Sequence, residues 1–273
     1  MSPFTLSEPL FTIWKRLIEE RTGICYDPGD RSLLASKLET RVTDAGFESA
    51  LDYYYFLRYD PGSAAEFDAL VDALVVNETY FFREAEPLRA LCETVLLPLC
   101  KRGERPRVWC AACASGEEVF TLAMMLDGLG ILSKVELVAS DIGLKVLARA
   151  KEGTYGPRSL RALPPGVMGD SLEMKDGRAC VRPRLRETIS WRRVNLLDDE
   201  AVRALGTFDA ILCRNVFIYF SSDTVRRVVA TLSSALKETA PLLLGASESI
   251  LQLGTALRFE ERGGSFFYVR SGK

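Results

Sequence analysis

Two acidic residues, Glu117 and Asp141, follow apolar runs at a spacing that suits recognition of a positively charged nucleoside. Glu117 comes after the apolar residues 108–111 and a stretch of small residues that ends at Gly116. A carboxylate in the first turn of a helix suits the helix dipole but would repel a pyrophosphate placed there. Asp141 ends a second apolar run 25 residues after Gly116, where an acid can bond the paired hydroxyls of a ribose. A ribose-bearing, phosphate-free cofactor with a cationic centre describes S-adenosylmethionine (SAM).

The segment around Glu117 is typical of the first strand, turn and helix of a nucleotide-binding α/β domain. Small side chains at residues 111–116 allow the backbone to approach a ligand closely, and Gly116 can adopt conformations closed to other residues. A second interpretation of Asp141 stays open, because an acid at a strand end also caps a following helix.

The chain contains no histidine, which excludes Ser-His-Asp and Cys-His catalysis, histidine-ligated metals and imidazole acid–base chemistry. Its chemistry therefore needs no such base, or the protein only binds. The pair Cys110 and Cys113 is weak support for a metal or redox site without histidines or a second pair. We expect both to pack in the core; a thiol cluster with Cys213 is the alternative, and no metal site is predicted.

Composition predicts a soluble cytoplasmic protein with one large or two smaller domains. The 273 residues are 48% hydrophobic and 26% charged, and no apolar run approaches membrane-spanning length. Seven cysteines, an odd number, fit a reducing compartment. The net charge of −2 is too even for a nucleic-acid reader, but residues 158–193 hold nine basic residues against four acids.

Four or five short helices are predicted in the first 80 or so residues, with apolar positions at helical spacing. Residues 77–83 alone are typical of a helix boundary, with Asn77 or Thr79 as the cap. A long helix then runs from Glu86 to about Cys100 and is expected to link two domains.

The remainder predicts alternating strands and helices with one interruption. Asp176 and Gly177 lie between two short strands, which indicates a tight hairpin, and residues 187–193 form a further strand. A buried parallel strand ends at Cys213, just before Arg214 and Asn215, and the last strands close the sheet as an antiparallel hairpin.

Six motifs resemble the chemotaxis-receptor glutamate methyltransferases, the CheR family, nearly end to end. They are Asn77-Glu-Thr-Tyr-Phe-Phe-Arg-Glu84, Ala112-Cys-Ala-Ser-Gly-Glu-Glu118, Ser140-Asp-Ile142, Val194-Asn-Leu-Leu-Asp198, Phe208-Asp-Ala-Ile-Leu-Cys-Arg-Asn-Val-Phe-Ile-Tyr-Phe220 and Gly245-Ala-Ser-Glu248. The resemblance implies a Rossmann-like α/β SAM methyltransferase domain with a small β-subdomain insert, preceded by a small all-α domain. The expected boundaries are 1–84 for the helical domain, 85–273 for the SAM-binding domain and about 159–193 for the insert.

The resemblance also implies the site residues and reverses the helix-boundary reading of residues 77–83. Family cofactor contacts fall on Asn77, Thr79, Arg83, Glu117, Asp141, Asn195, Leu196, Arg214 and Asn215. Tyr219 matches the tyrosine that the family places near the transferred methyl group, and is the expected catalytic residue.

The function implied is methyl transfer from SAM to glutamates of chemotaxis-type receptors, with S-adenosylhomocysteine (SAH) as product. A glutamate carboxylate is already ionised at neutral pH, so its attack on a sulfonium methyl needs no general base. The expected partner is the cytoplasmic helical domain of methyl-accepting chemotaxis receptors, with no nucleic acid, no membrane insertion and a monomeric enzyme. Two alternatives remain, a non-catalytic SAM- or SAH-binding adaptor of the same fold and, less favoured, a nicotinamide-dependent oxidoreductase.

The basic insert is the expected receptor-facing surface. Alternation on a strand would place Arg182, Arg184 and Arg186 on one side, with Pro183 at a sheet edge. The insert lacks the glycine-rich loop of family members that grip a receptor tail, so we expect recognition of the receptor body without its tail.

Overall fold

The computed structural model describes residues 4–270, and backbone contacts divide the chain into two units. The first comprises residues 4–76 and 219–224; the second comprises residues 77–218 and 225–270. The sequence analysis placed this boundary at Glu84. Residues 77–84 fall in the second unit because Phe81 is fully buried there, with its ring 4.8 Å from that of Tyr155.

The first unit is all-helical, as predicted. Its helices are α1 (Glu8–Thr22), α2 (Arg31–Asp44), α3 (Ala50–Tyr59) and α4 (Ala64–Leu74), with the short 3-10 turns η1 (Pro28–Asp30) and η2 (Pro61–Ser63). The helices bury an apolar face that includes Trp14, Leu34 and Tyr53, all with no exposed surface. The Tyr53 hydroxyl donates to Glu66 Oε1 at 2.6 Å, and the same carboxylate pairs with Arg41 at 2.7 Å.

Residues 219–224 belong to the helical unit because they pack at the end of α1. Ile24 forms an antiparallel bridge with Phe220, and the Cys25 amide donates to the Tyr219 carbonyl at 2.8 Å. Gly23 ends α1 with a φ of 82°, and a Cβ there would lie 3.1 Å from the Phe220 ring. Only glycine suits both the left-handed backbone and this close approach.

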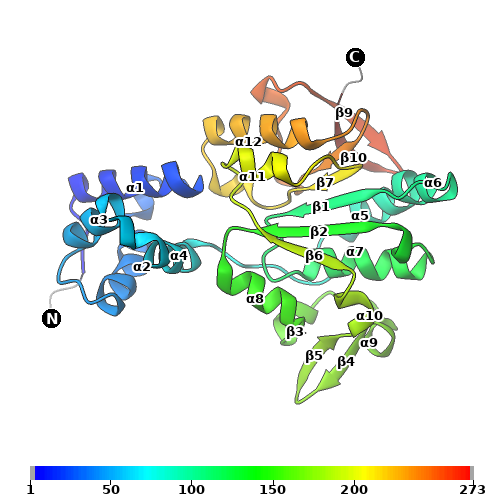
Figure 1. The fold of residues 1–273 in the computed structure, drawn as a ribbon, viewed down its shortest axis with the longest axis horizontal. Helices are drawn as coiled ribbons and strands as arrows, with labels where there is room; N and C mark the ends of the chain where they lie inside the picture. The colour runs from blue at the N-terminus through cyan, green and yellow to red at the C-terminus, as the bar shows by residue number, and fades with distance from the viewer. Residues whose placement is uncertain (1–3, 271–273) are drawn as a thin grey trace. The chain divides into compact units, whose positions relative to one another are not determined.

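The second unit is built on a seven-stranded sheet (Figure 1). Its order is β6 (Ile189–Arg193), β2 (Glu136–Asp141), β1 (Arg107–Ala111), β7 (Ala210–Leu212), β8 (Pro241–Leu243), β10 (Ser265–Arg270) and β9 (Leu257–Arg262). The first five strands are parallel, and β10 runs antiparallel to β8 and β9. The predicted antiparallel closure is confirmed, and β1 lies centrally, where strand order reverses.

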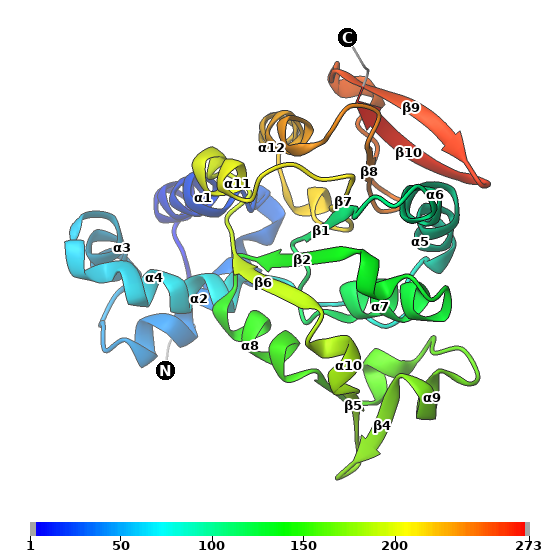
Figure 2. The same cartoon turned by 45° about the vertical axis from the view of Figure 1, so that its right-hand side comes forward.

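Helices cover both faces of this sheet (Figures 1 and 2). They are α7 (Glu117–Gly128) and α8 (Leu144–Glu152) on one face and α11 (Asp199–Ala204) and α12 (Ser222–Ala235) on the other. Val108 and Cys110 share one buried cluster with Val119 of α7, whereas Trp109 points to the opposite face. Between Phe4 and Arg270, no helix is both long and apolar enough to cross a membrane.

The long helix expected as a linker is instead a covering helix of the second unit. It consists of α5 (Ala85–Leu91), a π-helical turn η3 (Cys92–Leu96) and α6 (Leu97–Lys101). Leu88, Leu91 and Leu96 are buried in the same apolar cluster as Val108 of β1. The linker interpretation was therefore wrong, because the buried leucines of this helix pack into the core of the second unit.

The insert is a three-stranded sheet of order β3 (Thr154–Tyr155), β5 (Arg178–Val181) and β4 (Leu172–Lys175). Asp176 and Gly177 have φ of 51° and 74°, the positive values of a type I′ hairpin turn, which confirms the predicted hairpin. β6 pairs with β2, so residues 189–193 belong to the main sheet and not to the insert.

The prediction that Arg182, Arg184 and Arg186 alternate along a strand was wrong. Residues Pro183–Arg186 form the short helix α10, with Pro183 in its first position. Proline suits that position because its missing N–H has no helical acceptor and its φ is already helical. Arg182 precedes the helix, so the three guanidinium groups do not share a strand face.

Candidate functional site

The turn between β1 and α7 has the backbone expected of small residues. Ala112, Ala114 and Gly116 all have positive φ, at 53°, 46° and 89°. A Cβ on Gly116 would lie 3.0 Å from the Trp191 ring, so glycine is needed for space as well as conformation. The Cys113 amide donates to the Ser140 carbonyl at 2.8 Å, which fixes the turn beside the end of β2.

Glu117 opens α7 as a buried carboxylate, only 1% exposed. The Ser115 hydroxyl donates to its Oε2 at 2.7 Å, and the Ser159 hydroxyl donates to its Oε1 at 2.8 Å. Hydrogen bonds to an ionised oxygen are stronger than neutral ones, so these two fix the carboxylate firmly. A buried acid held in this way is a suitable receptor for a cationic group.

Asp141 ends β2 and anchors the same turn. Its Oδ2 accepts from the Ala114 amide and its Oδ1 from the Gly143 amide, each at 2.9 Å. Gly143 precedes α8, so the interpretation of Asp141 as a helix-capping group has structural support. The ribose contact stays a prediction; the structure places the carboxylate where it was expected, beside the β1–α7 turn.

Asn195 and Leu196 follow β6 at the neighbouring position of the sheet. The Val194 amide donates to the Asp141 carbonyl at 3.1 Å, which brings this loop against the end of β2. Asn195 Oδ1 accepts from the Leu197 amide at 3.0 Å, and Leu196 is 7% exposed. These residues therefore lie beside Asp141, and their contact with the cofactor stays a prediction.

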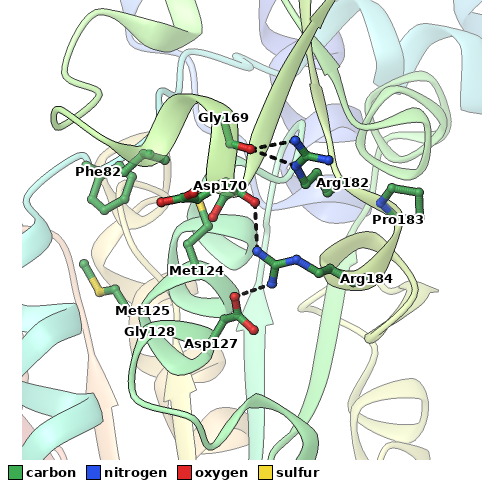
Figure 3. A pocket seen from close by; sticks show the side chains of 12 residues that line it. Phe82, Met124, Met125, Asp127, Gly128, Gly169, Asp170, Arg182, Pro183 and Arg184 are labelled. Carbon is green, nitrogen blue, oxygen red and sulfur yellow. Dashed lines mark hydrogen bonds and ion pairs between the residues drawn. The ribbon is translucent and has the colours of Figure 1, made fainter.

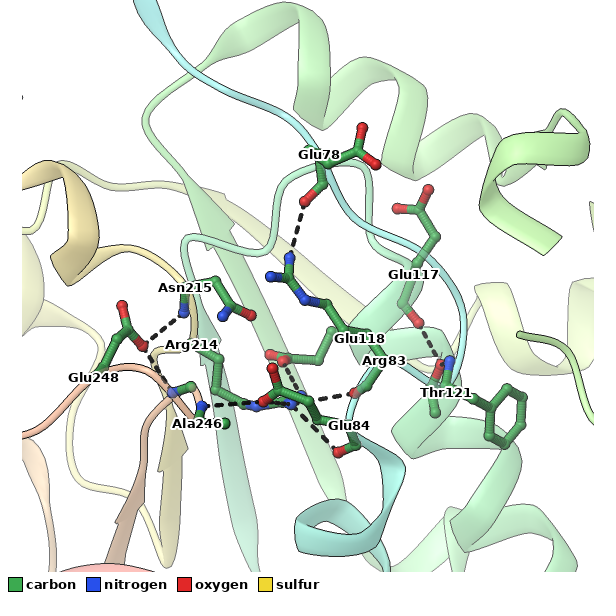
Figure 4. A network of polar contacts seen from close by, with 12 residues as sticks. Glu78, Arg83, Glu84, Glu117, Glu118, Thr121, Arg214, Asn215, Ala246 and Glu248 are labelled. Atoms are coloured by element: carbon green, nitrogen blue, oxygen red, sulfur yellow. Dashed lines mark hydrogen bonds and ion pairs between the residues drawn. The ribbon is translucent and has the colours of Figure 1, made fainter. Parts of the chain in front are cut away.

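Arg214, at the end of β7, is buried between two carboxylates (Figure 4). Its Nη2 pairs with Glu84 Oε2 and its Nη1 with Glu118 Oε2, both at 2.8 Å. Nη2 also donates to the carbonyls of Arg83 and Glu84 at 3.2 and 3.3 Å. Within residues 4–270, the buried Arg214 Nε has no hydrogen-bond partner. Arg214 thus joins the end of β7 to the 77–84 segment.

The pKa values of the two carboxylates around Arg214 are shifted in opposite directions. Burial acts to raise the pKa of Glu84, but the hydrogen bond and charge of Arg214, with the Ala246 amide, hold it below its ordinary value. Burial raises the pKa of Glu118, and the charge of Arg214 offsets this only in part. The difference follows from the balance of two effects: burial raises a carboxyl pKa and a nearby guanidinium lowers it, and burial prevails at the less exposed Glu118.

Asn215 is held by Glu248, a buried acid from the loop after β8 (Figure 4). Glu248 Oε2 accepts from the amides of Asn215 and Gly245 at 2.7 Å, and Oε1 accepts from Val216 and Phe217 at 2.7 and 2.6 Å. Asn215 has a positive φ of 60°. The four amides explain how this residue keeps an uncommon backbone conformation.

The 77–84 segment runs past the start of α7. The Phe81 amide donates to the Ser159 carbonyl at 2.9 Å, and the Phe82 amide donates to Thr121 Oγ1 at 3.0 Å. The Arg83 guanidinium donates to the Glu78 carbonyl at 3.1 Å. Arg83 is therefore brought to the same region as Arg214; Asn77 is exposed and Thr79 half-buried at the beginning of the segment.

Tyr219 ends the 3-10 turn η6 (Phe217–Tyr219), four positions after Asn215. By its contacts it belongs to the helical unit. Its expected catalytic role stays a prediction.

The buried cysteines are unsuited to reactivity. Cys110, Cys113 and Cys213 are at most 3% exposed, and burial raises the pKa of each thiol well above its ordinary value. Since the thiolate is the reactive form, these residues act as small core side chains. Over the described part of the chain, no group of three or more histidine, cysteine, aspartate or glutamate residues is arranged to hold a metal.

A cavity of about 740 Å³ lies between the end of α7 and the insert (Figure 3). Arg182 lines it and donates to the Gly169 carbonyl at 2.6 Å. Arg184 also lines it, pairing with Asp127 and donating to the Asp170 carbonyl at 2.8 Å. Arg184 therefore joins the insert to α7, whereas Arg182 bonds within the insert, and the positive charge of both is partly engaged within the protein.

The sequence analysis did not identify three residues that organise the site. They are Glu84, Glu118 and Glu248, and each lies in a motif on which the family resemblance rests. Their partners are remote, since 130 positions separate Glu84 from Arg214. The available signal was the presence of each acid in a matched motif. The position of the acid in the sequence did not identify the residue with which it pairs.

Comparisons with known proteins show which family the chain belongs to. Residues 77–263 match the family model described as CheR methyltransferase, SAM binding domain, and residues 9–75 match that described as CheR methyltransferase, all-alpha domain. A chemotaxis protein methyltransferase from Vibrio anguillarum is 35% identical over 263 residues, covering 93% of this chain and 94% of the relative. Chemotaxis protein methyltransferase 1 from Pseudomonas aeruginosa is 34% identical over 253 residues, covering 89% and 91%. The chain therefore belongs to the CheR methyltransferase family, and it is a SAM-dependent methyltransferase with an all-α domain ahead of a Rossmann-like cofactor-binding domain.

Proposed function

We propose that this protein transfers the methyl group of SAM to glutamate side chains of chemotaxis receptors and forms glutamyl methyl esters. The observation that supports it most directly is the pair of carboxylates at the β1–α7 turn: Glu117 begins α7 after that turn, and Asp141, at the end of β2, accepts from the Ala114 amide within it. The relatives named chemotaxis protein methyltransferase support the substrate class. Nothing in the structure favours a non-catalytic adaptor.

The residues present fit SAM. The Glu117 carboxylate, fixed by two hydroxyls, would bind the ammonium of the cofactor, and Asp141 would accept from the ribose hydroxyls. SAM supplies an electrophilic methyl group on a sulfonium when bound. The remaining contacts are proposed for Asn77, Thr79, Arg83, Asn195, Leu196, Arg214 and Asn215.

The chain's contribution to the reaction is positioning. The attacking glutamate is ionised at neutral pH because its ordinary pKa lies well below 7, so no base is required. A protein without histidine can therefore perform this reaction. Orienting the two reacting groups and removing water from the attacking oxygen can supply roughly 7–11 kcal/mol of the barrier reduction.

We propose the cytoplasmic helical domain of the receptor as the substrate. The test is transfer of labelled methyl groups from SAM to receptor-bearing membranes, followed by mild alkali. Glutamyl methyl esters release volatile methanol under alkali, whereas methyl groups on nitrogen remain. Label that is absent, or that resists alkali, would contradict the proposal; a receptor whose methylated glutamates are replaced by alanine is the matched control.

Tyr219 is proposed to act at the transferred methyl group. Tyr219→Phe should lower the turnover number about 10-fold while SAH affinity changes by less than about 2-fold, because its contribution is made in the transition state. Turnover and calorimetric affinity measured on the same preparation check this. Equal losses in both would mean that Tyr219 only shapes the binding site.

A further inference from the structure

The Glu117 carboxylate is held from two separate parts of the chain. Ser115 lies in the β1–α7 turn itself, and its carbonyl accepts from the Tyr155 hydroxyl at 2.6 Å. Ser159 lies in the 3-10 turn η5 (Pro157–Leu160) at the base of the insert, 42 positions from Glu117. The insert therefore reaches the acid that is proposed to bind the cofactor ammonium.

Ser159 is fixed by its own backbone before it contacts Glu117. Its amide donates to the Gly156 carbonyl at 3.1 Å, and its carbonyl accepts from the Phe81 amide at 2.9 Å. The Phe81 and Tyr155 rings pack edge to face, both at most 2% exposed, beneath this turn. The hydroxyl is therefore presented by a rigid support and not by a mobile surface loop.

We propose that Ser159 is a positioning residue, which orients the Glu117 carboxylate toward the ammonium group of SAM and makes the insert part of cofactor recognition. This inference rests on the proposed role of Glu117. A buried carboxylate that loses one of its two hydroxyl donors loses its fixed orientation. The loss should affect only ligands that carry the ammonium group.

The test compares SAH with 5′-methylthioadenosine, which has the same nucleoside but lacks the amino-acid part. In calorimetric titrations, Ser159→Ala should weaken SAH binding about 10-fold and methylthioadenosine binding less than about 2-fold. Ser159→Thr keeps the hydroxyl and should restore SAH affinity to within about 3-fold of the wild type. Ser171→Ala, a change at a buried serine elsewhere in the insert, should leave both affinities unchanged.

Three results would overturn the inference. They are wild-type SAH affinity in Ser159→Ala, equal weakening of both ligands, and failure of Ser159→Thr to recover. If Ser159→Ala does not fold, Ser159→Cys provides the same comparison, because a thiol is a weaker donor and should give an intermediate, SAH-selective loss. Failure of the wild type to bind SAH would instead overturn the cofactor site itself.

Discussion

The turns after β1 and β7 are each anchored by one buried carboxylate, but the two carboxylates have different tasks. Asp141 holds Ala114 in the first turn and is also proposed to bind the cofactor ribose. Glu248 accepts from four backbone amides around Asn215, which occupy the four acceptor positions of a carboxylate. In the proposed site, Asp141 would combine support of the first turn with recognition of the cofactor. In the second turn the two tasks are separate: Glu248 supports the backbone and Asn215 is the proposed contact.

The largest effect is expected from Glu248→Ala. Four amides would lose their acceptor in a buried loop, and we expect a loss of about 3–4 kcal/mol in the free energy of unfolding. Urea denaturation measures it. A loss below about 1 kcal/mol would show that water replaces the carboxylate and that the second turn does not depend on it.

Compared with Glu248→Ala, Asp141→Ala should reduce stability less and should weaken SAH binding directly. Two backbone amides lose an acceptor, so the stability loss should be smaller than for Glu248→Ala. SAH binding should weaken by about 1–3 kcal/mol, because a hydrogen-bonding partner of the ligand is also removed. Calorimetric titration of SAH into the wild type and Asp141→Ala, at a temperature where both proteins are folded, tests this. Equal affinity of the two proteins for SAH would exclude the ribose contact.

Gly245→Ala tests whether the second turn has room for a side chain at this position. A Cβ at this position would lie 2.6 Å from Asn215 Nδ2 and 2.8 Å from Glu248 Oε2, so we expect a cost of about 1–2 kcal/mol in unfolding free energy. Gly128→Ala is the matched control, since its added Cβ would meet nothing within 4 Å. Equal stabilities of the two variants would mean that the turn adapts without loss.

The smallest effect concerns the pH dependence of the Arg214 network. Because the pKa of Glu84 is lowered, its contribution is complete above its ordinary value of 4.5 and is lost as pH falls through the folded-state pKa. Glu84→Gln should therefore cost about 0.5–1 kcal/mol at pH 7 and progressively less below pH 4.5. Denaturation midpoints measured across this range should converge with those of the wild type.

Glu118→Gln should show the opposite sign. The pKa of Glu118 is raised, so the folded wild type gains stability as pH falls toward 4.5, a gain that glutamine cannot make. The free energy of unfolding of the wild type should therefore rise relative to that of the variant as pH falls through that window. Parallel pH profiles for the two variants would mean that the acids are not distinguished by their surroundings.

The comparison also shows which parts of the site could be predicted from sequence. Glu117 follows the small-residue turn after one apolar strand, and Asp141 ends the next. Parallel strands bring their carboxyl ends to one edge of a sheet, so the local pattern was enough to place both residues. Asp176 and Gly177 likewise specify a hairpin turn without other information.

Features that depend on remote partners were not predictable in this way. Glu84 and Glu248 act on Arg214 and Asn215 from distant parts of the chain, and no periodicity reports such pairs. The strand prediction for residues 182–186 was wrong for a local reason. A proline among alternating arginines suits an edge strand and also the first position of a helix.

The central claim is that Glu117 and Asp141 hold the cofactor at the carboxyl ends of β1 and β2. A crystal structure of the protein with SAH tests it most directly. We predict the SAH amino group within hydrogen-bonding distance of the Glu117 carboxylate and the ribose hydroxyls on Asp141. SAH bound away from these strand ends, or with its ribose not in contact with Asp141, would contradict the account.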